Sequence, residues 1–216
     1  LRLTDHLQFF DVLRCDKSTA AHGLEVRVPF LDNDFVFHGK KYEQIATSLY
    51  EHLYNSKVTE FGCVPSDKHK MLGASPDGIV TDAKSERYGR MLEIKNIVNR
   101  EIDGNPLKAY WIQMQIQLET CDLEYCDFLE TRIKEYEKEE EFYNDTKERG
   151  VILHFVEKIT ISSDNGENIS SYSGQPNYIY MPLDNNLDKE SIDKWIGENK
   201  TELSEKWSLY STIYWY

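Results

Sequence analysis

The chain has 216 residues, of which 40% are hydrophobic and 12% aromatic, and this is enough for a sizeable core in one or two domains. The sequence contains neither a membrane-span-like run of roughly 18 apolar residues nor a signal-peptide pattern at its start, so we expect an intracellular protein that is neither membrane-bound nor secreted. The net charge of −13 argues against a nucleic-acid partner, but residues 136–216 hold 16 acidic and 8 basic side chains, which places most of the excess in the C-terminal part.

Hydrophobic periodicity predicts alternating helices and strands in the middle of the chain. After a compositionally distinct segment, 1–36, a helix is expected from His38 because apolar residues recur at spacings of three and four. The pattern then predicts, in chain order, strands at Val58–Val64, Ile79–Val80 and 90–97, a helix opened by Pro106 and running to Leu118, and a strand at 125–133. This order predicts an α/β (α+β) fold for residues 37–136, in which a small mixed sheet is flanked by helices.

The C-terminal extension, residues 137–216, is acidic and carries weaker patterns. A charged, helix-prone stretch covers 135–148, a strand is expected at 151–161, and a helix at 188–207. Because the chain begins with Leu1 and ends on the aromatic run 214–216, we expect it to be a piece of a longer product.

Two short motifs carry the candidate chemistry. In Ser75-Pro76-Asp77-Gly78, a turn leads into a strand and places the Asp77 carboxylate at a sheet edge. In Leu92-Glu93-Ile94-Lys95, the acid and the lysine are two residues apart, so they share one face of a strand. Either motif alone is an ordinary turn or strand edge. Together they predict a site where two carboxylates bind a hard cation and a lysine acts on water for phosphodiester hydrolysis.

The chain from His38 to Tyr136 resembles the YqaJ-like viral recombinase nucleases, relatives of lambda exonuclease in the PD-(D/E)xK superfamily. The resemblance implies a restriction-endonuclease-like core. The segments that carry it are Gly39-Lys40-Lys41-Tyr42-Glu43, residues 72–79, Leu92-Glu93-Ile94-Lys95, residues 110–115 and Cys126-Asp127-Phe128. The chain departs from many relatives after the motif lysine, where it has Asn96-Ile97 in place of Cys-Pro.

The resemblance also implies roles for individual residues. Mg²⁺ or Mn²⁺ would be bound by Asp77, Glu93 and the backbone carbonyl of Ile94, with Glu43 at the metal or its waters. Lys95 would handle the nucleophilic water, and Gln113 would support Lys95 or the DNA. Ser75, Arg100 and Gln115 are candidate DNA contacts. Helical spacing instead predicts a core position for Tyr110 and Trp111.

The function implied is a divalent-metal-dependent deoxyribonuclease, with DNA as its partner. An exonuclease acting on double-stranded DNA ends in viral recombination or replication is the leading hypothesis. Such enzymes work with a single-strand annealing protein and form ring-shaped homo-oligomers, so both are expected partners. The alternatives are an endonuclease of the same superfamily and a non-catalytic DNA-binding remnant.

The first segment resembles another family. Residues 11–32, within a stretch of about thirty residues (5–35), are similar to part of the synthetase domain of glutamine-dependent asparagine synthetases. The Ser-Gly-Gly-x-Asp-Ser pyrophosphate loop of that chemistry is absent from the 216 residues, so no synthetase activity is expected. Either a fusion or a chance likeness explains the segment.

Overall fold

The computed structural model describes residues 34–162 and 168–216 of the protein. The segment similar to asparagine synthetase lies almost entirely outside the described residues. The chain forms two compact units, of which the first ends at Arg132 and the second runs from Ile133 to Tyr216. Within the described ranges, no helix combines the length and the apolar character needed to cross a membrane.

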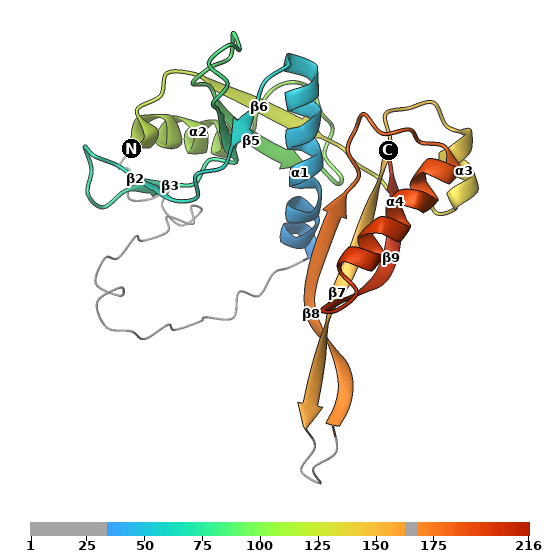
Figure 1. The fold of residues 1–216 in the computed structure, drawn as a ribbon. Helices are drawn as coiled ribbons and strands as arrows, with labels where there is room; N and C mark the ends of the chain where they lie inside the picture. Colours follow the sequence, from blue (N-terminus) through green and yellow to red (C-terminus); the bar gives the residue numbers. More distant parts are fainter. Residues whose placement is uncertain (1–33, 163–167) are drawn as a thin grey trace. The chain divides into compact units, whose positions relative to one another are not determined.

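Within its described residues, the first unit contains two helices and six short strands; Figure 1 shows the arrangement of the chain. Its elements in chain order are α1 (Asp34–Tyr54), β1 (Val58–Thr59), β2 (Val64–Pro65), β3 (Gly73–Ala74), β4 (Gly78–Val80), β5 (Met91–Asn96), α2 (Lys108–Cys121) and β6 (Cys126–Thr131).

The main sheet of the first unit has the strand order β1-β4-β5-β6. β4 pairs antiparallel with both β1 and β5, whereas β5 and β6 are parallel. Parallel neighbours need a crossover connection, and α2 is the helix within that crossover. The predicted fold class, a small mixed sheet with flanking helices, is confirmed.

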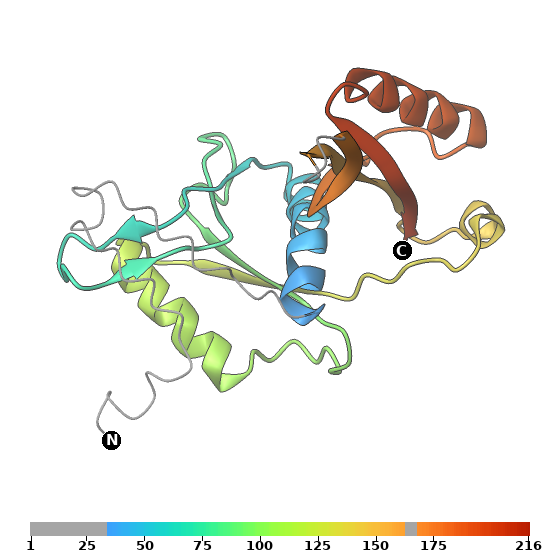
Figure 2. The same cartoon turned by 90° about the horizontal axis from the view of Figure 1, so that it is seen from below.

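The two helices cover opposite faces of β5 (Figure 2). Ala46 and Tyr50 of α1 pack with Leu92 and Ile94 in one buried cluster. Side chains alternate along a strand, so Glu93 points to the other face, where it contacts α2. Because β5 is covered on both sides, its first four residues, Met91 to Ile94, are all at most 5% exposed.

A charged cluster around Asp127 of β6 ties α1 to the β4–β5 loop. The Tyr50 hydroxyl donates to Asp127 Oδ2 at 2.6 Å, and Arg90 Nη1 donates to Oδ1 at 2.9 Å. Arg87 also pairs with Asp127, and its guanidinium stacks 3.5 Å from the ring centroid of Tyr54. Burial, followed by the bond to Asp127, raises the pKa of Tyr50, so its phenol stays a donor.

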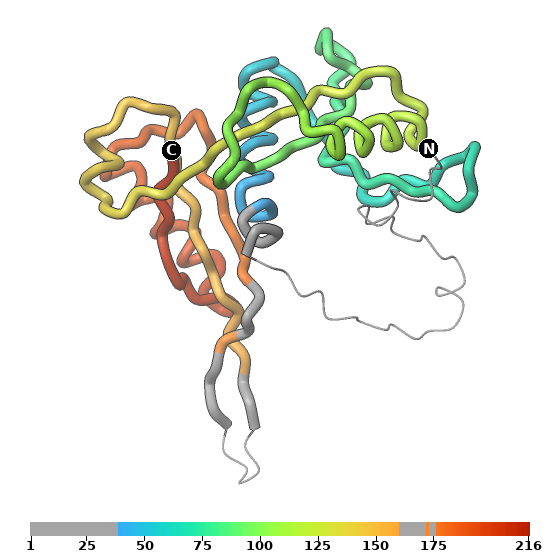
Figure 3. The backbone as a smooth tube through the Cα atoms, turned by 180° about the vertical axis from the view of Figure 1, so that it is seen from behind, coloured from blue at the N-terminus to red at the C-terminus, as the bar shows by residue number. Residues whose placement is uncertain are grey.

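Among its described residues, the second unit has a three-stranded antiparallel sheet of order β8-β7-β9 and two helices. Its elements are α3 (Glu139–Asn144), β7 (Gly150–Ser162), β8 (Asn168–Tyr180), α4 (Lys189–Glu202) and β9 (Trp207–Trp215), and β7 and β8 run side by side as a long hairpin (Figure 3). The core consists of Val151, Leu153 and Phe155 of β7 packed with Phe142 and Ile192 of the helices.

The structure differs from the sequence predictions at several boundaries. The strand expected at Val58–Val64 is two separate strands, β1 and β2, because Gly62 adopts φ +63 between them. The helix predicted to start at His38 begins at Asp34, and the one predicted to start at Pro106 begins at Lys108. The helix expected over 188–207 ends at Glu202, and the charged stretch 135–148 is helical only in α3.

Candidate active site

Asp77 lies in the turn just before β4 and binds the edge of β5. Its Oδ2 accepts a hydrogen bond from the Ile94 backbone N–H at 2.5 Å. The pairing of β4 with β5 ends at Leu92, so Asp77 occupies the edge beyond the last pair. The N–H and C=O groups of one strand residue point to the same side, which means that the Ile94 carbonyl faces the same edge as Asp77.

Glu93 and Lys95 share the opposite face of β5, as their spacing predicted. Lys95 Nζ forms an ion pair with Glu93 Oε1. Two glutamines of α2 also donate to this carboxylate, Gln113 to Oε1 at 2.8 Å and Gln117 to Oε2 at 3.0 Å. Glu93 is only 1% exposed, so a buried carboxylate is satisfied by one cation and two amides.

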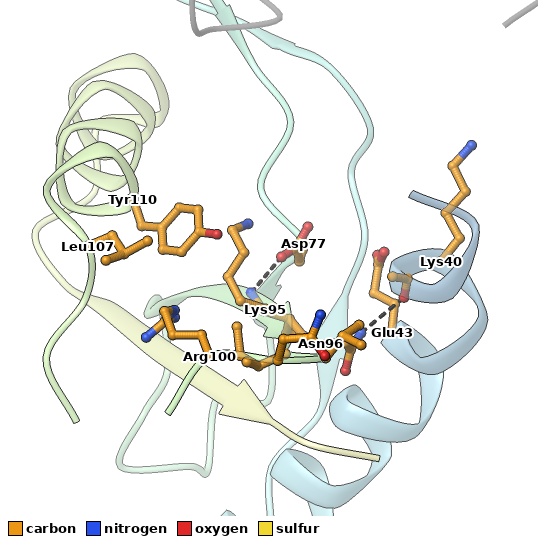
Figure 4. Close-up of a pocket in the computed structure, with 13 residues that line it drawn as sticks. Lys40, Glu43, Asp77, Lys95, Asn96, Arg100, Leu107 and Tyr110 are labelled. Carbon is orange, nitrogen blue, oxygen red and sulfur yellow. Dashed lines mark hydrogen bonds between the residues drawn. The ribbon is translucent and has the colours of Figure 1, made fainter. Parts of the chain in front are cut away.

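A cavity of about 650 Å³ opens beside these residues (Figure 4). α1 contributes Lys40 and Glu43, Asp77 comes from the turn, and Lys95 comes from β5. The loop after β5 lines the cavity up to Arg100, and Tyr110 of α2 forms the far side, its ring 5.3 Å from Lys95 Nζ. Glu93 is not among the described residues that line this cavity.

The acidic side chains of the site disfavour one another's ionised forms. Burial, followed by the charge of Glu93, raises the pKa of Asp77 to about 7. Burial, followed by the charge of Glu60, raises the pKa of Glu43. A site that concentrates negative charge in this way gains from a bound cation, because the cation relieves the repulsion.

The donor set is compatible with a hard divalent ion. Within the described residues no three carboxylate, imidazole or thiolate groups are close enough to enclose a metal by themselves. Mg²⁺ is bound through one or two carboxylates and keeps several of its waters, so a complete protein cage is not required. Asp77, Glu43 and the Ile94 carbonyl all face the cavity or its edge, which is the kind of open oxygen set that such an ion takes.

The other predicted site residues lie in different surroundings. Arg100 lines the cavity and pairs with the Glu130 carboxylate, which is 4% exposed. Ser75 and Gln115 are exposed, and neither is among the described residues that line the cavity. Residues two apart on a helix face different sides, so Gln113 and Gln115 cannot both reach Glu93. The core position predicted for Trp111 is wrong, because its side chain is 53% exposed.

Two residues of the site were not predicted from the sequence. Gln117 follows Gln113 by four residues, and this spacing on a helix would have placed the two on one face. Glu60 lines a smaller cavity of about 120 Å³ together with Glu43 and Asp77. No motif surrounds Glu60, so only the folded structure brings it near the site.

Replacing Gly78 with alanine is expected to destabilise the protein by about 1–3 kcal/mol, because overpacking forces neighbouring groups apart. An added Cβ would lie 2.2 Å from Val58 Cγ1, so the Val58 side chain or β1 itself must shift beside Asp77. Thermal denaturation of the full chain measures the effect. Gly197→Ala is the matched control, since nothing lies within 4 Å of an added Cβ there and alanine favours α4. An unchanged melting temperature for Gly78→Ala would contradict the expected clash.

Comparisons with known proteins agree with the predicted resemblance. The family model described as the YqaJ-like viral recombinase domain matches residues 10–124, starting earlier than the resemblance seen in the sequence. An uncharacterized protein of Acanthamoeba polyphaga mimivirus is 36% identical over 217 residues, which cover 87% of this chain. The chain spans 39% of the length of that relative.

Two further similarities are more limited. Human asparagine synthetase is 68% identical over 34 residues, a short local match that covers 16% of this chain and 6% of the synthetase. The crystal structure of the alkaline exonuclease LHK-Exo from Laribacter hongkongensis is similar with a TM-score of 0.41 at 22% identity, covering 80% of this chain and 66% of that one. Its complex with dAMP has a TM-score of 0.39 at 20% identity, covering 81% and 69%.

Proposed function

Because the chain belongs to the family of YqaJ-like viral recombinase domains, we propose that it is a divalent-metal-dependent deoxyribonuclease. We assign it exonuclease activity on double-stranded DNA ends, inside the cell, in viral recombination or replication. The observation that carries the proposal is the grouping of Asp77, Glu93 and Lys95 around the edge of β5, next to a cavity of about 650 Å³.

The metal of this proposal is Mg²⁺ or Mn²⁺. Asp77, Glu93 and the Ile94 carbonyl would hold it, with Glu43 at the metal or its waters. When bound, such an ion lowers the pKa of its water and stabilises the charge that grows on the phosphate. The Lys95 side chain is 23% exposed and lines the cavity. Its ammonium would orient the attacking water, and the amine would deprotonate that water only after releasing its own proton. The Gln113 amide keeps the Glu93 carboxylate in place beside Lys95.

DNA would be bound by basic and polar groups at the cavity. Arg100 uses its guanidinium for Glu130 and for the Glu101 carbonyl at 3.3 Å, and a guanidinium has five N–H donors, so donors remain for a phosphate. Ser75 and Gln115 are exposed and are proposed contacts for parts of the DNA strand farther from the site. A single-strand annealing protein and a ring of identical chains are proposed partners.

The test uses end-labelled linear DNA and covalently closed circular DNA, each with Mg²⁺, Mn²⁺ or EDTA. We expect loss of the linear DNA with either metal, no loss with EDTA, and intact circles. Analytical ultracentrifugation of the same preparation tests the ring.

The alternatives give different results in this assay. Cutting of the circles supports an endonuclease. If neither substrate is degraded with either metal but DNA still binds in a gel-shift assay, the chain is a binding remnant and the enzyme proposal is wrong.

A further inference from the structure

The two glutamines of α2 make different contacts with Glu93. Gln113 and Lys95 both donate to Oε1, whereas Gln117 donates to Oε2. Gln117 is 5% exposed and Glu93 1%, so this second contact is made in the interior, where water does not compete for the carboxylate.

Gln117 also reaches the segment that carries Asp77. Its Nε2 lies 3.5 Å from the Ser75 carbonyl oxygen, at the long end of hydrogen-bonding distance, and Ser75 precedes Asp77 by two residues. One amide therefore contacts both chain segments that bear the motif carboxylates. Gln113 does not make this bridge: among the described residues, its side chain hydrogen-bonds to Glu93 and not to the Ser75 segment.

The other end of the Gln117 side chain is unsatisfied. Its Oε1 is buried and has no hydrogen-bond partner within the part of the chain that the structure describes. A buried acceptor without a partner costs free energy, and rotating the amide would set Oε1 against the Glu93 carboxylate. The donor contacts of its Nε2 therefore determine how the Gln117 amide is oriented. An apolar side chain of the same size would not leave a buried acceptor unsatisfied.

Counting acceptor directions shows what the contact does to Glu93. A carboxylate has about four lone-pair sites, two on each oxygen. Lys95 and Gln113 occupy those of Oε1, while Gln117 occupies one of those of Oε2. Among the described residues, one direction on Oε2 stays open, and the carboxylate cannot rotate without breaking the bond to Gln117.

We propose that Gln117 is a positioning residue for the metal site: it holds the Glu93 carboxylate in one orientation and links it to the Ser75–Asp77 turn. The inference rests on the proposed function, since it assigns a partner to a metal ligand. It predicts that Gln117 acts on metal affinity through Glu93 without touching the ion. Partners that orient metal ligands typically change affinity by about 10- to 100-fold when they are removed.

The test is Gln117→Met in the full chain, which keeps the side-chain volume and removes the donor. Binding of Mn²⁺ alone is measured by calorimetry and by the rise of the melting temperature on Mn²⁺ titration. We expect the titration midpoint to move to about 10- to 100-fold higher Mn²⁺, with cleavage recovering at saturating metal. Should this variant not fold, Gln117→Asn keeps an amide in the core but shortens its reach, and the same shift is expected.

Thr120→Val is the matched control. Thr120 lies on the same helix, is also 5% exposed, and donates its hydroxyl to the Ile116 carbonyl at 2.7 Å. We expect it to lower the melting temperature without moving the Mn²⁺ midpoint. If Gln117→Met and Gln117→Asn behave like Thr120→Val, Gln117 is only a structural residue and the inference is wrong. If the parent chain neither binds Mn²⁺ nor cuts DNA, the proposed function itself fails.

Discussion

Lys95→Met is expected to lower DNA cleavage by about a thousandfold, because a positioned acid–base group typically contributes 10²- to 10⁴-fold. Methionine keeps most of the side-chain length and removes the ammonium group. Lys95 pairs with Glu93 and lines the cavity with Asp77, so its loss removes both the group proposed to act on water and a charge that compensates the acids. Single-turnover cleavage of end-labelled linear DNA at saturating Mg²⁺ measures the effect.

The control for this variant is Lys84→Met, an exposed lysine in the loop between β4 and β5. It removes the same charge from the chain and is expected to leave cleavage within about twofold, because surface charges act weakly through screened solvent. Circular dichroism shows whether both variants keep the fold. Cleavage by Lys95→Met within tenfold of the parent rate would contradict the role proposed for Lys95.

Asp127→Ala is expected to destabilise the protein by about 3 kcal/mol. Removing one partner of a buried, hydrogen-bonded charge typically costs about 3–5 kcal/mol, and the partial exposure of Arg87 and Arg90 places this case at the lower end. The Tyr50 hydroxyl loses its acceptor while its side chain stays 2% exposed. Urea unfolding at fixed protein concentration measures the free energy of unfolding.

Glu119→Ala is the matched control for the ion pair. Glu119 lies 3.5 Å from Lys68, and both side chains are more than half exposed. Exposed pairs contribute about 0–1 kcal/mol, so little change is expected. A loss at Asp127→Ala no larger than that of Glu119→Ala would show that the Asp127 cluster does not hold α1 against the sheet.

The arrangement of the motif could be predicted because it depends on local geometry. Residues two apart on a strand share one face, and β5 does place Glu93 and Lys95 on the same side. A carboxylate in a Gly-flanked turn reaches a sheet edge, where Asp77 accepts from Ile94. These are properties of a few consecutive residues.

Contacts between distant segments could not be predicted in the same way. Periodicity along the chain states which face of a helix is apolar, but not which element packs against it, and so the exposure of Trp111 was missed. β8 and β9 were not predicted because strand pairing depends on partners far away in the sequence. Glu60 and Gln117 also reach the site through contacts between segments far apart in the sequence, so the sequence did not show that they join it.

The sequence by itself determined the fold class, the strand that carries Glu93 and Lys95, and the turn that carries Asp77, since turn chemistry and side-chain alternation are local. Only the tertiary structure decided how these groups are satisfied. Packing of α2 against β5 buries Glu93 beneath two glutamine amides and the Lys95 ammonium, and α1 brings Glu43 to the cavity from the other face of the sheet. Burial raises the pKa of Asp77 and of Glu43, and burial depends on the whole fold rather than on neighbouring residues.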